Sequence, residues 1–512
     1  MKGTVHYETR GEIALLSIDN PPVNPLSSGV RQGLFDGMTK ALADEAVKAV
    51  VITGLNRAFI AGADISEFGA AASEGVGLGE ALEIMENSTK PVIAAINGTA
   101  FGGGLETALC CDYRIAAPTA PVGLPEVKLG LLPGAGGTQR LPRLIGAQAA
   151  LKAIVSGDPI MAPQAQKLGI VDRIAEGDIV EEGIKYAEEI VAAGSATRKI
   201  RDLTDKIAGD KGNTAVFEEA AAQLNKTNRG QFAPAQILKC VEAAVNADSF
   251  DAGMAVERTC FAACMQDPQR EALIHIFFAE RAANKIPGLS KEDPLIDINK
   301  GSVIGSGTMG GGIAMCFANA GIPVRLHDNN AENLAKGLKV IEGNYARTVS
   351  KGRLTQEAMD KRMSLIIPTE NFDDLGDADV VIEAVYENLD LKKEIFAKLD
   401  KVMKPGALLA TNTSGLDVDA ITNMTSRPEF VCGMHFFSPA NVMRLLEVVR
   451  GDASSPATLG TAMALGKRLG KVSVMAGNCP GFIGNRMIGG YSRQASTMIL
   501  EGAKPADVDR VI

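Results

Sequence analysis

Apolar and polar positions over residues 1–190 alternate between short β-rich runs and helical patterns, which predicts an α/β domain. Strands are expected at 48–54, 91–98 and 112–117, because each run is bounded by glycine, proline or a polar residue. Three glycine-rich joints lie among these elements, at 61–64, 102–104 and 133–137. Glycine at such joints lets the backbone come close to a ligand.

The pattern changes over residues 191–296. Glycine becomes rarer there and Ala, Glu, Gln and Lys dominate, so the region is predicted to be helical. Its longest amphipathic run covers 252–285, and the pair Pro287-Gly288 ends it. Residues 286–297 are expected to form a linker.

A second α/β pattern covers residues 297–478, where strand-like runs are separated by helical segments. This alternation predicts a parallel, doubly wound sheet. The strands are expected at 302–304, 324–327, 379–385, 407–410 and 430–434. Residues 479–512 are predicted to be helical, and the helix over 487–500 is expected to expose an apolar face.

The composition narrows the class of protein. Of the 512 residues, 46% are apolar and 22% are charged, which is typical of globular chains and argues against a disordered or fibrous one. The net charge of −9 argues against general nucleic-acid binding. No apolar run reaches the ~18 residues of a membrane span. The eight scattered cysteines and four distant histidines predict reduced intracellular thiols and no metal site.

The first set of candidate catalytic residues lies around the glycine triplet 102–104. Glycines at a helix start leave N–H groups accessible to a developing oxyanion, and the joint 59–64 supplies a second source of N–H donors. Glu106 and Glu126 are two carboxyl groups that can transfer protons beside an activated carbonyl. The alternative is that the glycines only permit close packing and both glutamates are solvated.

A series of motifs around these residues resembles the enoyl-CoA hydratase/isomerase (crotonase) family, whose domain is a spiral of ββα units. They are AGADI (61–65), ING (96–98), FGGGLE (101–106), CD (111–112), PE (125–126), LG (129–130) and PGAGGTQR (133–140). The resemblance implies that Glu106 and Glu126 are catalytic and that the N–H groups of Ala61 and Gly103 form the oxyanion hole. Because both glutamates are present, hydration is favoured over isomerisation alone.

The second candidate site begins with a strand, the glycines Gly305, Gly307 and Gly310 in the spacing G-x-G-x-x-G, and a helix. This order is typical of a dinucleotide-binding turn. Asp328 lies 23 residues after Gly305, near the position of a ribose-binding acid, and favours NAD over NADP. The alternative is a glycine-rich turn in another kind of α/β domain.

His435 follows the apolar run 430–434, where a doubly wound sheet places its ligands. A histidine there can accept the proton of a hydroxyl group that is being oxidised, and Glu447 can orient it. The alternative is a packed histidine in the core.

The second half resembles the L-3-hydroxyacyl-CoA dehydrogenase family, through VIGSGTMG (303–310), EAVYEN (383–388), TNTS (411–414), GMHFFSP (433–439), LEVV (446–449) and PGFIGNR (480–486). The resemblance implies that His435 is the catalytic base, that Glu447 is its partner, and that Ser414 and Asn485 contact the substrate. The implied NAD-binding positions are Gly305, Gly307, Met309, Gly310, Asp328, Glu387, Lys392, Ser414 and Ser438. Thr411 and Ser438 match the variants of the peroxisomal-type multifunctional enzymes.

The order of the two modules resembles the multifunctional fatty-acid β-oxidation enzymes. The implied reactions are hydration of trans-2-enoyl-CoA to L-3-hydroxyacyl-CoA and its oxidation by NAD to 3-ketoacyl-CoA, with Δ3,Δ2 isomerisation left open. The implied domains are a hydratase domain (1–190), a helical linker (191–296) whose run 252–285 packs on it, a dehydrogenase domain (297–478), and the start of a C-terminal helical domain (479–512).

The resemblance also bears on the substrates, the partners and the cellular compartment. It implies acyl-CoA substrates, leaves a thiolase partner and the oligomeric state open, and favours a bacterial cytoplasm, or a peroxisome in a eukaryote. The chain is expected to lack part of the C-terminal helical domain, which would weaken NADH production. Two alternatives are a non-catalytic acyl-CoA or NAD sensor and an enzyme that retains only one of the activities.

Overall fold

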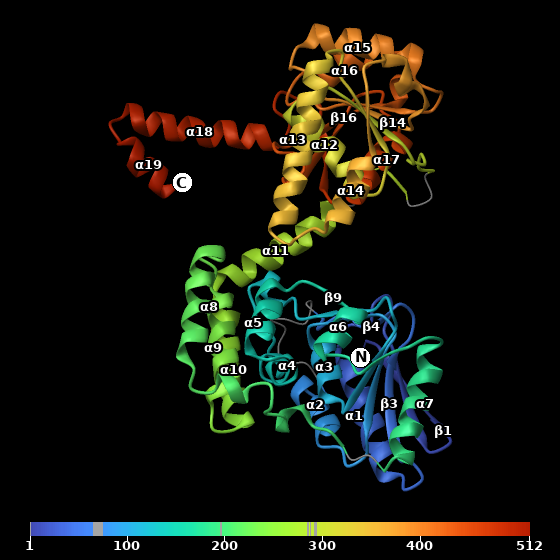
Figure 1. Cartoon of the computed structure of the whole chain (residues 1–512), viewed down its shortest axis with the longest axis vertical. Helices are drawn as coiled ribbons and strands as arrows, with labels where there is room; N and C mark the ends of the chain where they lie inside the picture. The colour runs from blue at the N-terminus through green and yellow to red at the C-terminus, as the bar shows by residue number, and fades with distance from the viewer. Residues whose placement is uncertain (1, 65–74, 195–196, 284–285, 287, 291–293) are drawn as a thin grey trace. The chain divides into compact units, whose positions relative to one another are not determined.

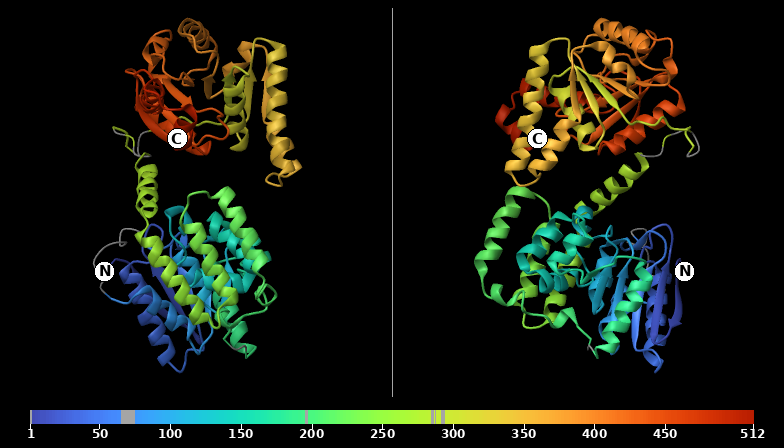
Figure 2. Two further views of the ribbon diagram at one scale, coloured as in Figure 1. Left: turned by 90° about the vertical axis from the view of Figure 1, so that its left-hand side faces the viewer. Right: turned by 45° about the vertical axis from the view of Figure 1, so that its right-hand side comes forward.

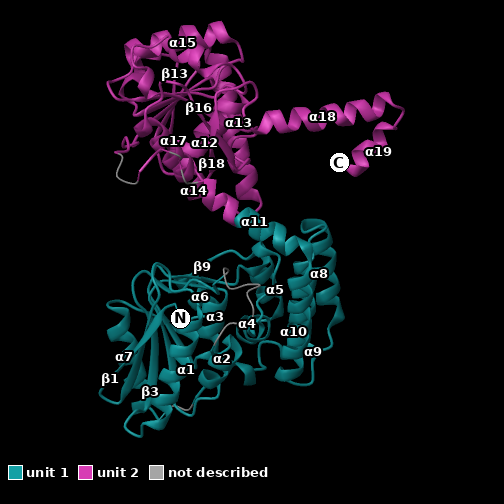
Figure 3. Ribbon diagram, turned by 180° about the vertical axis from the view of Figure 1, so that it is seen from behind, with its two compact units in different colours: residues 1–277 teal, residues 278–512 magenta. Residues whose placement is uncertain are grey.

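The computed structural model describes residues 2–64, 75–194, 197–283, 286, 288–290 and 294–512. These residues form two compact units, 1–277 and 278–512, which Figure 3 shows in different colours. Ile65 of the first motif and parts of the expected linker lie outside the described residues.

The first unit repeats a strand–strand–helix pattern (Figure 1). Strands β1 and β2 both belong to the larger of two sheets, and each of the next three turns gives one strand to each sheet. The elements are β1 (Thr4–Arg10), β2 (Ile13–Asp19), α1 (Ser28–Ala43), β3 (Ala49–Gly54), β4 (Ala58–Ile60), α2 (Leu78–Glu86), β5 (Val92–Ile96), β6 (Thr99–Phe101), α3 (Gly103–Cys110), β7 (Tyr113–Ala116), β8 (Pro121–Gly123), η2 (Glu126–Leu129), α4 (Gly137–Ile145), α5 (Ala147–Ser156), β9 (Ile160–Met161), α6 (Ala162–Leu168), β10 (Arg173–Ile174) and α7 (Ile179–Ala192). The larger sheet has the order β1-β2-β3-β5-β7-β10 and the smaller has the order β4-β6-β8-β9. The expected ββα spiral is therefore confirmed.

Both faces of the larger sheet are covered. Its central strands β3 and β5 are buried along their whole length, as expected of parallel strands with packing on both sides. Alternate residues point to opposite faces, so Val51 packs toward α7 while Val50 and Ile52 face the main core. The predicted strands 48–54, 91–98 and 112–117 are confirmed with slightly shorter ends.

Helices follow the two sheets, as the composition of 191–296 predicts. They are η3 (Ile200–Asp202), η4 (Ala208–Asp210), α8 (Thr214–Thr227), α9 (Ala233–Asn246), α10 (Phe250–Gln266) and α11 (Pro268–Ala283). In Figure 2 the green helices lie side by side, and α10 packs against α9 and α4. The single helical run expected at 252–285 is wrong, because Asp267 has extended backbone between α10 and α11. A residue before proline is biased toward extended geometry, and Pro268 begins α11.

The second unit is built on an eight-stranded sheet with the order β13-β12-β11-β14-β15-β16-β17-β18. Its elements are β11 (Gly301–Ile304), α12 (Thr308–Asn319), β12 (Val324–His327), α13 (Ala331–Ser350), α14 (Gln356–Ser364), β13 (Ile366–Thr369), η5 (Phe372–Asp377), β14 (Val380–Glu383), α15 (Leu389–Val402), β15 (Leu408–Thr411), α16 (Val418–Thr422), η6 (Pro428–Phe430), β16 (Val431–Phe436), β17 (Leu445–Arg450), α17 (Pro456–Arg468), β18 (Val472–Gly477), α18 (Gly484–Leu500) and α19 (Pro505–Val511).

The six neighbouring strands β13, β12, β11, β14, β15 and β16 are all parallel. Strand β17, which follows them in the sheet, is antiparallel to β16. The chain reverses its direction of travel across the sheet between β11 and β14, which confirms the doubly wound parallel arrangement. Ligands bind such sheets at the carboxyl ends of the strands beside this reversal.

The helix α18 exposes an apolar face, as the sequence predicts. Met487, Tyr491 and Leu500 are 72%, 57% and 88% exposed. The following helix α19 buries Val508. No helix in the described part of the chain is both long and apolar enough to span a membrane.

Candidate active sites

Glu106 lies in the first turn of α3, which begins directly after the glycine triplet as expected. Its side chain is 3% exposed, and its Oε1 accepts hydrogen bonds from the backbone N–H groups of Ala135 and Gly137, both at 2.8 Å. Burial raises the pKa of Glu106, whereas these two N–H groups and the Arg140 guanidinium oppose that rise. Glu106 is therefore a buried carboxyl group that two hydrogen bonds help to keep ionised.

Glu126 is the first residue of η2 and lies near Glu106. Its Oε2 is buried and accepts no hydrogen bond within the part of the chain that the structure describes. Burial and the neighbouring charges of Glu106 and Glu257 raise the pKa of Glu126 well above its usual value. The two environments differ, so the structure favours a proton on Glu126 and a charge on Glu106.

The oxyanion-hole position expected at Ala61 is wrong. The Ala61 N–H donates to the carbonyl oxygen of Val23 at 3.1 Å, so it is already used in the core of the unit. Two residues later, the nitrogen of Ala63 lies 3.8 Å from the position that a Cβ atom on Gly103 would take. Gly103 is the first residue of α3, and such N–H groups have no partner within their own helix. The structure therefore pairs Gly103 with Ala63.

Glu257 is a third buried carboxyl group here, and the sequence-based predictions missed it. It lies on α10 and is 0% exposed, and it accepts hydrogen bonds from Gly136 N–H at 2.7 Å and Thr138 N–H at 3.2 Å. Burial and the charge of Glu106 raise the pKa of Glu257 to about 8. The sequence did contain an indication of its burial, because Glu257 lies at helical spacing from Gly253 and Cys260, which are buried on the same face of α10.

The raised pKa of Glu257 should make the stability of the first unit depend on pH. The pKa of Glu257 is about 8 in the folded chain, well above the 4.5 that is usual for a glutamate side chain. The folded state therefore binds more protons than the unfolded state over this range, so the free energy of unfolding falls as the pH rises. Urea unfolding across this range should show that fall, and Glu257→Gln should make it smaller. An unchanged dependence in the variant would contradict this assignment.

The glycine turn of the second unit joins β11 to α12. Gly305 has φ +98°, and a Cβ atom there would lie 2.7 Å from the carbonyl oxygen of Ala384. A Cβ atom on Gly310 would lie 1.8 Å from the carbonyl oxygen of Gly305, whereas one on Gly307 would meet nothing. Gly305 and Gly310 thus permit close packing, and Gly307 leaves the helix start open to a phosphate. Met309, in the first turn of α12, packs against the core.

Asp328 follows β12 and faces the glycine turn. Its Oδ2 accepts hydrogen bonds from the backbone N–H and the hydroxyl of Ser306, at 3.0 and 2.7 Å. Burial alone would raise the pKa of Asp328, but these bonds and the Asn330 N–H lower it. The ionised acid therefore sits beside the turn, where it can accept hydrogen bonds from a ribose. Arg325 pairs with Asp377, so it is not directed at a phosphate.

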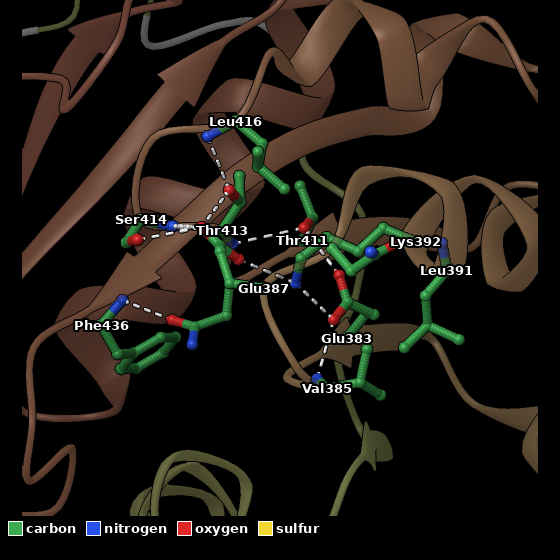
Figure 4. Close-up of polar contacts among 12 residues, drawn as sticks. Glu383, Val385, Glu387, Leu391, Lys392, Thr411, Thr413, Ser414, Leu416 and Phe436 are labelled. Atoms are coloured by element: carbon green, nitrogen blue, oxygen red, sulfur yellow. Dashed lines mark hydrogen bonds and ion pairs between the residues drawn. The ribbon is translucent and has the colours of Figure 1, made fainter.

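Glu387 connects the carboxyl ends of β14 and β15. Its Oε1 accepts hydrogen bonds from the N–H and hydroxyl of Ser414, at 2.7 and 2.9 Å, and from the hydroxyl of Thr413 (Figure 4). Although burial would raise the pKa of Glu387, these bonds and the Lys392 charge lower it. Ser414 is therefore held at the edge of the sheet where a nicotinamide would lie.

Direct contact between Lys392 and the cofactor is a further wrong expectation. The Lys392 side chain is 0% exposed, and its Nζ lies 2.7 Å from Glu383 Oε1 and 3.3 Å from Glu387 Oε2 (Figure 4). The hydroxyl of Thr411 donates to the other oxygen of Glu383 at 2.7 Å. Lys392 is therefore paired with Glu383 and Glu387 inside the unit.

His435 and Glu447 lie directly opposite each other in the register of β16 and β17. His435 Nδ1 is 2.7 Å from Glu447 Oε2, and both residues are buried. Burial would raise the pKa of Glu447, but the bonds from His435 and from the N–H groups of Gly484 and Ile483 lower it. His435 is inside β16 rather than after its end, because the strand continues to Phe436.

Asn485 and Ser438 are the two remaining predicted positions. Asn485 follows Gly484, whose N–H binds Glu447, and Ser438 lies three residues after His435. Asn485, in the first turn of α18, donates from Nδ2 to the carbonyl oxygen of Ser414 at 3.0 Å. Ser438 is exposed two residues after β16. Among the described residues there is no group of three or more side chains suited to hold a metal ion.

Comparisons with known proteins match one family model to each half of the chain. Residues 8–232 match the family model described as "Enoyl-CoA hydratase/isomerase", and residues 300–479 match "3-hydroxyacyl-CoA dehydrogenase, NAD binding domain". The chain is 44% identical to a peroxisomal bifunctional enzyme of Danio rerio over 99% of its own length and 70% of that relative. It is 43% identical to the human peroxisomal bifunctional enzyme, covering 98% and 69%.

A plant relative is more distant. A peroxisomal fatty acid beta-oxidation multifunctional protein of Arabidopsis thaliana is 37% identical, covering 98% of this chain and 70% of the relative. The chain therefore belongs to the family of multifunctional β-oxidation enzymes that join an enoyl-CoA hydratase/isomerase domain to an NAD-binding 3-hydroxyacyl-CoA dehydrogenase domain. These relatives give no support to the bacterial cytoplasm that the sequence alone favoured.

Proposed function

We propose that Glu106 and Glu126 hydrate trans-2-enoyl-CoA as a base and an acid. The observation that carries this assignment is the difference between their surroundings: Glu106 accepts two N–H bonds, whereas Glu126 Oε2 accepts none within the described chain. Glu106 orients a water molecule and takes its proton as the oxygen bonds to C3. Glu126 gives its proton to C2, which leaves Glu106 protonated and Glu126 ionised. Release of the proton from Glu106 to solvent and uptake of one proton by Glu126 then restore the site.

Gly103 and Ala63 supply the N–H groups for the thioester oxygen in this proposal. Negative charge develops on that oxygen while water adds to C3, and two fixed donors in a buried site stabilise it. The same arrangement would support a shift of a Δ3 double bond to Δ2, because one carboxyl group can remove a proton and the other can return one. Isomerisation is therefore part of the proposal.

His435 is the proposed base of the oxidation step. Its Nδ1 is bound to Glu447, so its Nε2 is the atom that accepts the proton of the C3 hydroxyl, and Glu447 stabilises the resulting imidazolium. Ser414 and Asn485 would orient the hydroxyl and the thioester. The glycine turn and Asp328 fit NAD, which accepts the hydride from C3 when it is bound. Glu387 and Ser438 would border its nicotinamide.

The Asp328 carboxylate predicts tighter binding of NAD than of NADP. Two bonds from Ser306 fix the acid, which repels a 2′-phosphate and accepts bonds from the ribose hydroxyls. A hydrogen bond to a charged group is worth about 1.5–3 kcal/mol, or about 10- to 10²-fold in affinity. Calorimetric titration with both cofactors measures the ratio. Equal affinities, or an unchanged ratio in Asp328→Asn, would remove Asp328 from this role.

One assay separates the proposal from its alternatives. Purified protein is incubated with a medium-chain trans-2-enoyl-CoA, with and without NAD. The proposal predicts 3-hydroxyacyl-CoA without NAD, and NADH with 3-ketoacyl-CoA when NAD is added. A sensor would consume no enoyl-CoA, and an enzyme with one activity would stop at the hydroxy product.

We propose a hydratase domain at 1–190, a helical region at 191–296 whose helix α10 completes that domain, a dehydrogenase domain at 297–478, and helices at 479–512 that belong with it. The names of the relatives support a peroxisomal setting. A thiolase that consumes the 3-ketoacyl-CoA product is the expected partner, and gel filtration would define the oligomeric state.

A further inference from the structure

Four successive N–H groups at the start of α4 are divided between two carboxyl groups from different parts of the chain. Within residues 135–138, the first and third donate to Glu106 Oε1, both at 2.8 Å. The second and fourth donate to Glu257, at 2.7 and 3.2 Å. Glu106 comes from α3 and Glu257 comes from α10, so the segment 135–138 is held from both sides.

The groups that face Glu257 come from every element around it. Glu106 on α3 and Glu126 on η2 are carboxyl groups that interact with it, and Arg140 on α4 is the nearby cation. The thiol of Cys240 on α9 also interacts with Glu257. The hydroxyl of Thr138 also donates to Glu257 Oε2 and in turn accepts from Gln139 Nε2 at 3.0 Å.

Burial of a carboxyl group lowers the stability of the fold unless hydrogen bonds compensate for its lost hydration, and Glu257 is completely buried. Its two oxygens do more than satisfy the start of a helix, because the N–H groups that they bind alternate with those that bind Glu106. A displacement of 136 or 138 would therefore displace 135 and 137, and with them the oxygen of Glu106 that they hold.

We propose that Glu257 is a positioning residue for the hydration step, because it fixes the segment 135–138 and thereby the carboxylate of Glu106. This inference rests on the proposed role of Glu106. Helix α10, which follows the two sheets of the first unit, would then contribute a residue to the hydration step. Glu257 has a second effect, because its charge adds to those that raise the pKa of Glu126.

The test compares Glu257→Gln with the wild-type chain in hydration of crotonyl-CoA across pH. Glutamine has one acceptor oxygen where two are needed, so kcat should fall, by up to about 10²-fold for a displaced catalytic group, with little change in KM. Activity needs the proton on Glu126, and removal of a neighbouring charge lowers the pKa of Glu126. The alkaline limb of the pH profile should therefore move to lower pH.

Two further variants make the test specific. Thr138→Val removes the hydroxyl donor to Glu257 but keeps every bond to Glu106, and it should shift the alkaline limb in the same direction by less. It also serves if Glu257→Gln does not fold. Asp251→Asn removes an exposed carboxylate from the same helix, α10, and should change neither kcat nor the profile.

The possible outcomes are distinct. Wild-type kcat and pH profile in Glu257→Gln would overturn the inference. So would a lower amount of active protein with an unshifted profile, because that is the result of a purely structural role. Glu106→Gln is measured in parallel: if that variant hydrates at the wild-type rate, the proposed function is wrong. If it is inactive while Glu257→Gln and Thr138→Val behave as wild type, only the role of Glu257 is wrong.

Discussion

Replacement of Glu106 or Glu126 by glutamine is expected to lower kcat for hydration by ~10²–10⁴-fold, the usual cost of losing a catalytic acid or base. Glu106→Gln removes the base that takes the proton from water, and Glu126→Gln removes the acid that protonates C2. NAD binding should survive both changes, because the glycine turn and Asp328 lie in the other compact unit. The measurement is the loss of enoyl-thioester absorbance together with calorimetric titration of NAD.

The matched control is Glu188→Gln, which changes an exposed glutamate on α7. It should hydrate at the wild-type rate. Wild-type hydration by either Glu106→Gln or Glu126→Gln would show that the assigned site is wrong. Loss of NAD binding in these variants would show instead that the substitutions disturb the whole chain.

Lys392→Met is expected to destabilise the second unit by about 3–5 kcal/mol, the usual effect of breaking a buried ion pair from one side. Lys392 and Glu383 are both 0% exposed and lie 2.7 Å apart, so the substitution leaves a buried carboxylate without its cation. The double variant Lys392→Met/Glu383→Gln should recover part of the loss, because it removes both charges. Urea unfolding of the second unit measures the free energy of unfolding of the wild-type chain and of each variant.

An exposed pair in the same unit provides the control. Lys300 and Asp377 are 54% and 48% exposed, so Lys300→Met should cost far less, within about 1 kcal/mol. Equal effects of Lys392→Met and Lys300→Met would contradict the buried position of Lys392. A loss of NAD affinity without a loss of stability would restore Lys392 as a direct cofactor contact.

Much of the fold was predictable because local pattern and tertiary role coincide. The strand-like runs 324–327 and 407–410 lie between turn residues, and each forms an interior strand of the second sheet with nearly the expected ends. Apolar periodicity alone did not show the interruption at Asp267. The proline that follows it was the available signal.

The sites were predictable at residues whose chemistry is carried by a motif, such as Glu106 and His435. Ala61 was misassigned because a sequence does not reveal which N–H of a joint is used by the core. Lys392 was misplaced because its burial depends on the packing of α15. Glu257 was missed because its partners are backbone groups 119 and 121 residues away.

The most direct test follows the oxygen atom that hydration adds to C3. The chain is incubated with trans-2-enoyl-CoA in water enriched in oxygen-18, without NAD, and the product is analysed by mass spectrometry. We predict 3-hydroxyacyl-CoA with the heavy oxygen at C3 from the wild-type chain, and almost none from the double variant Glu106→Gln/Glu126→Gln. Undiminished label from the double variant, or no labelled product from the wild-type chain, would contradict a hydratase site built on these two glutamates.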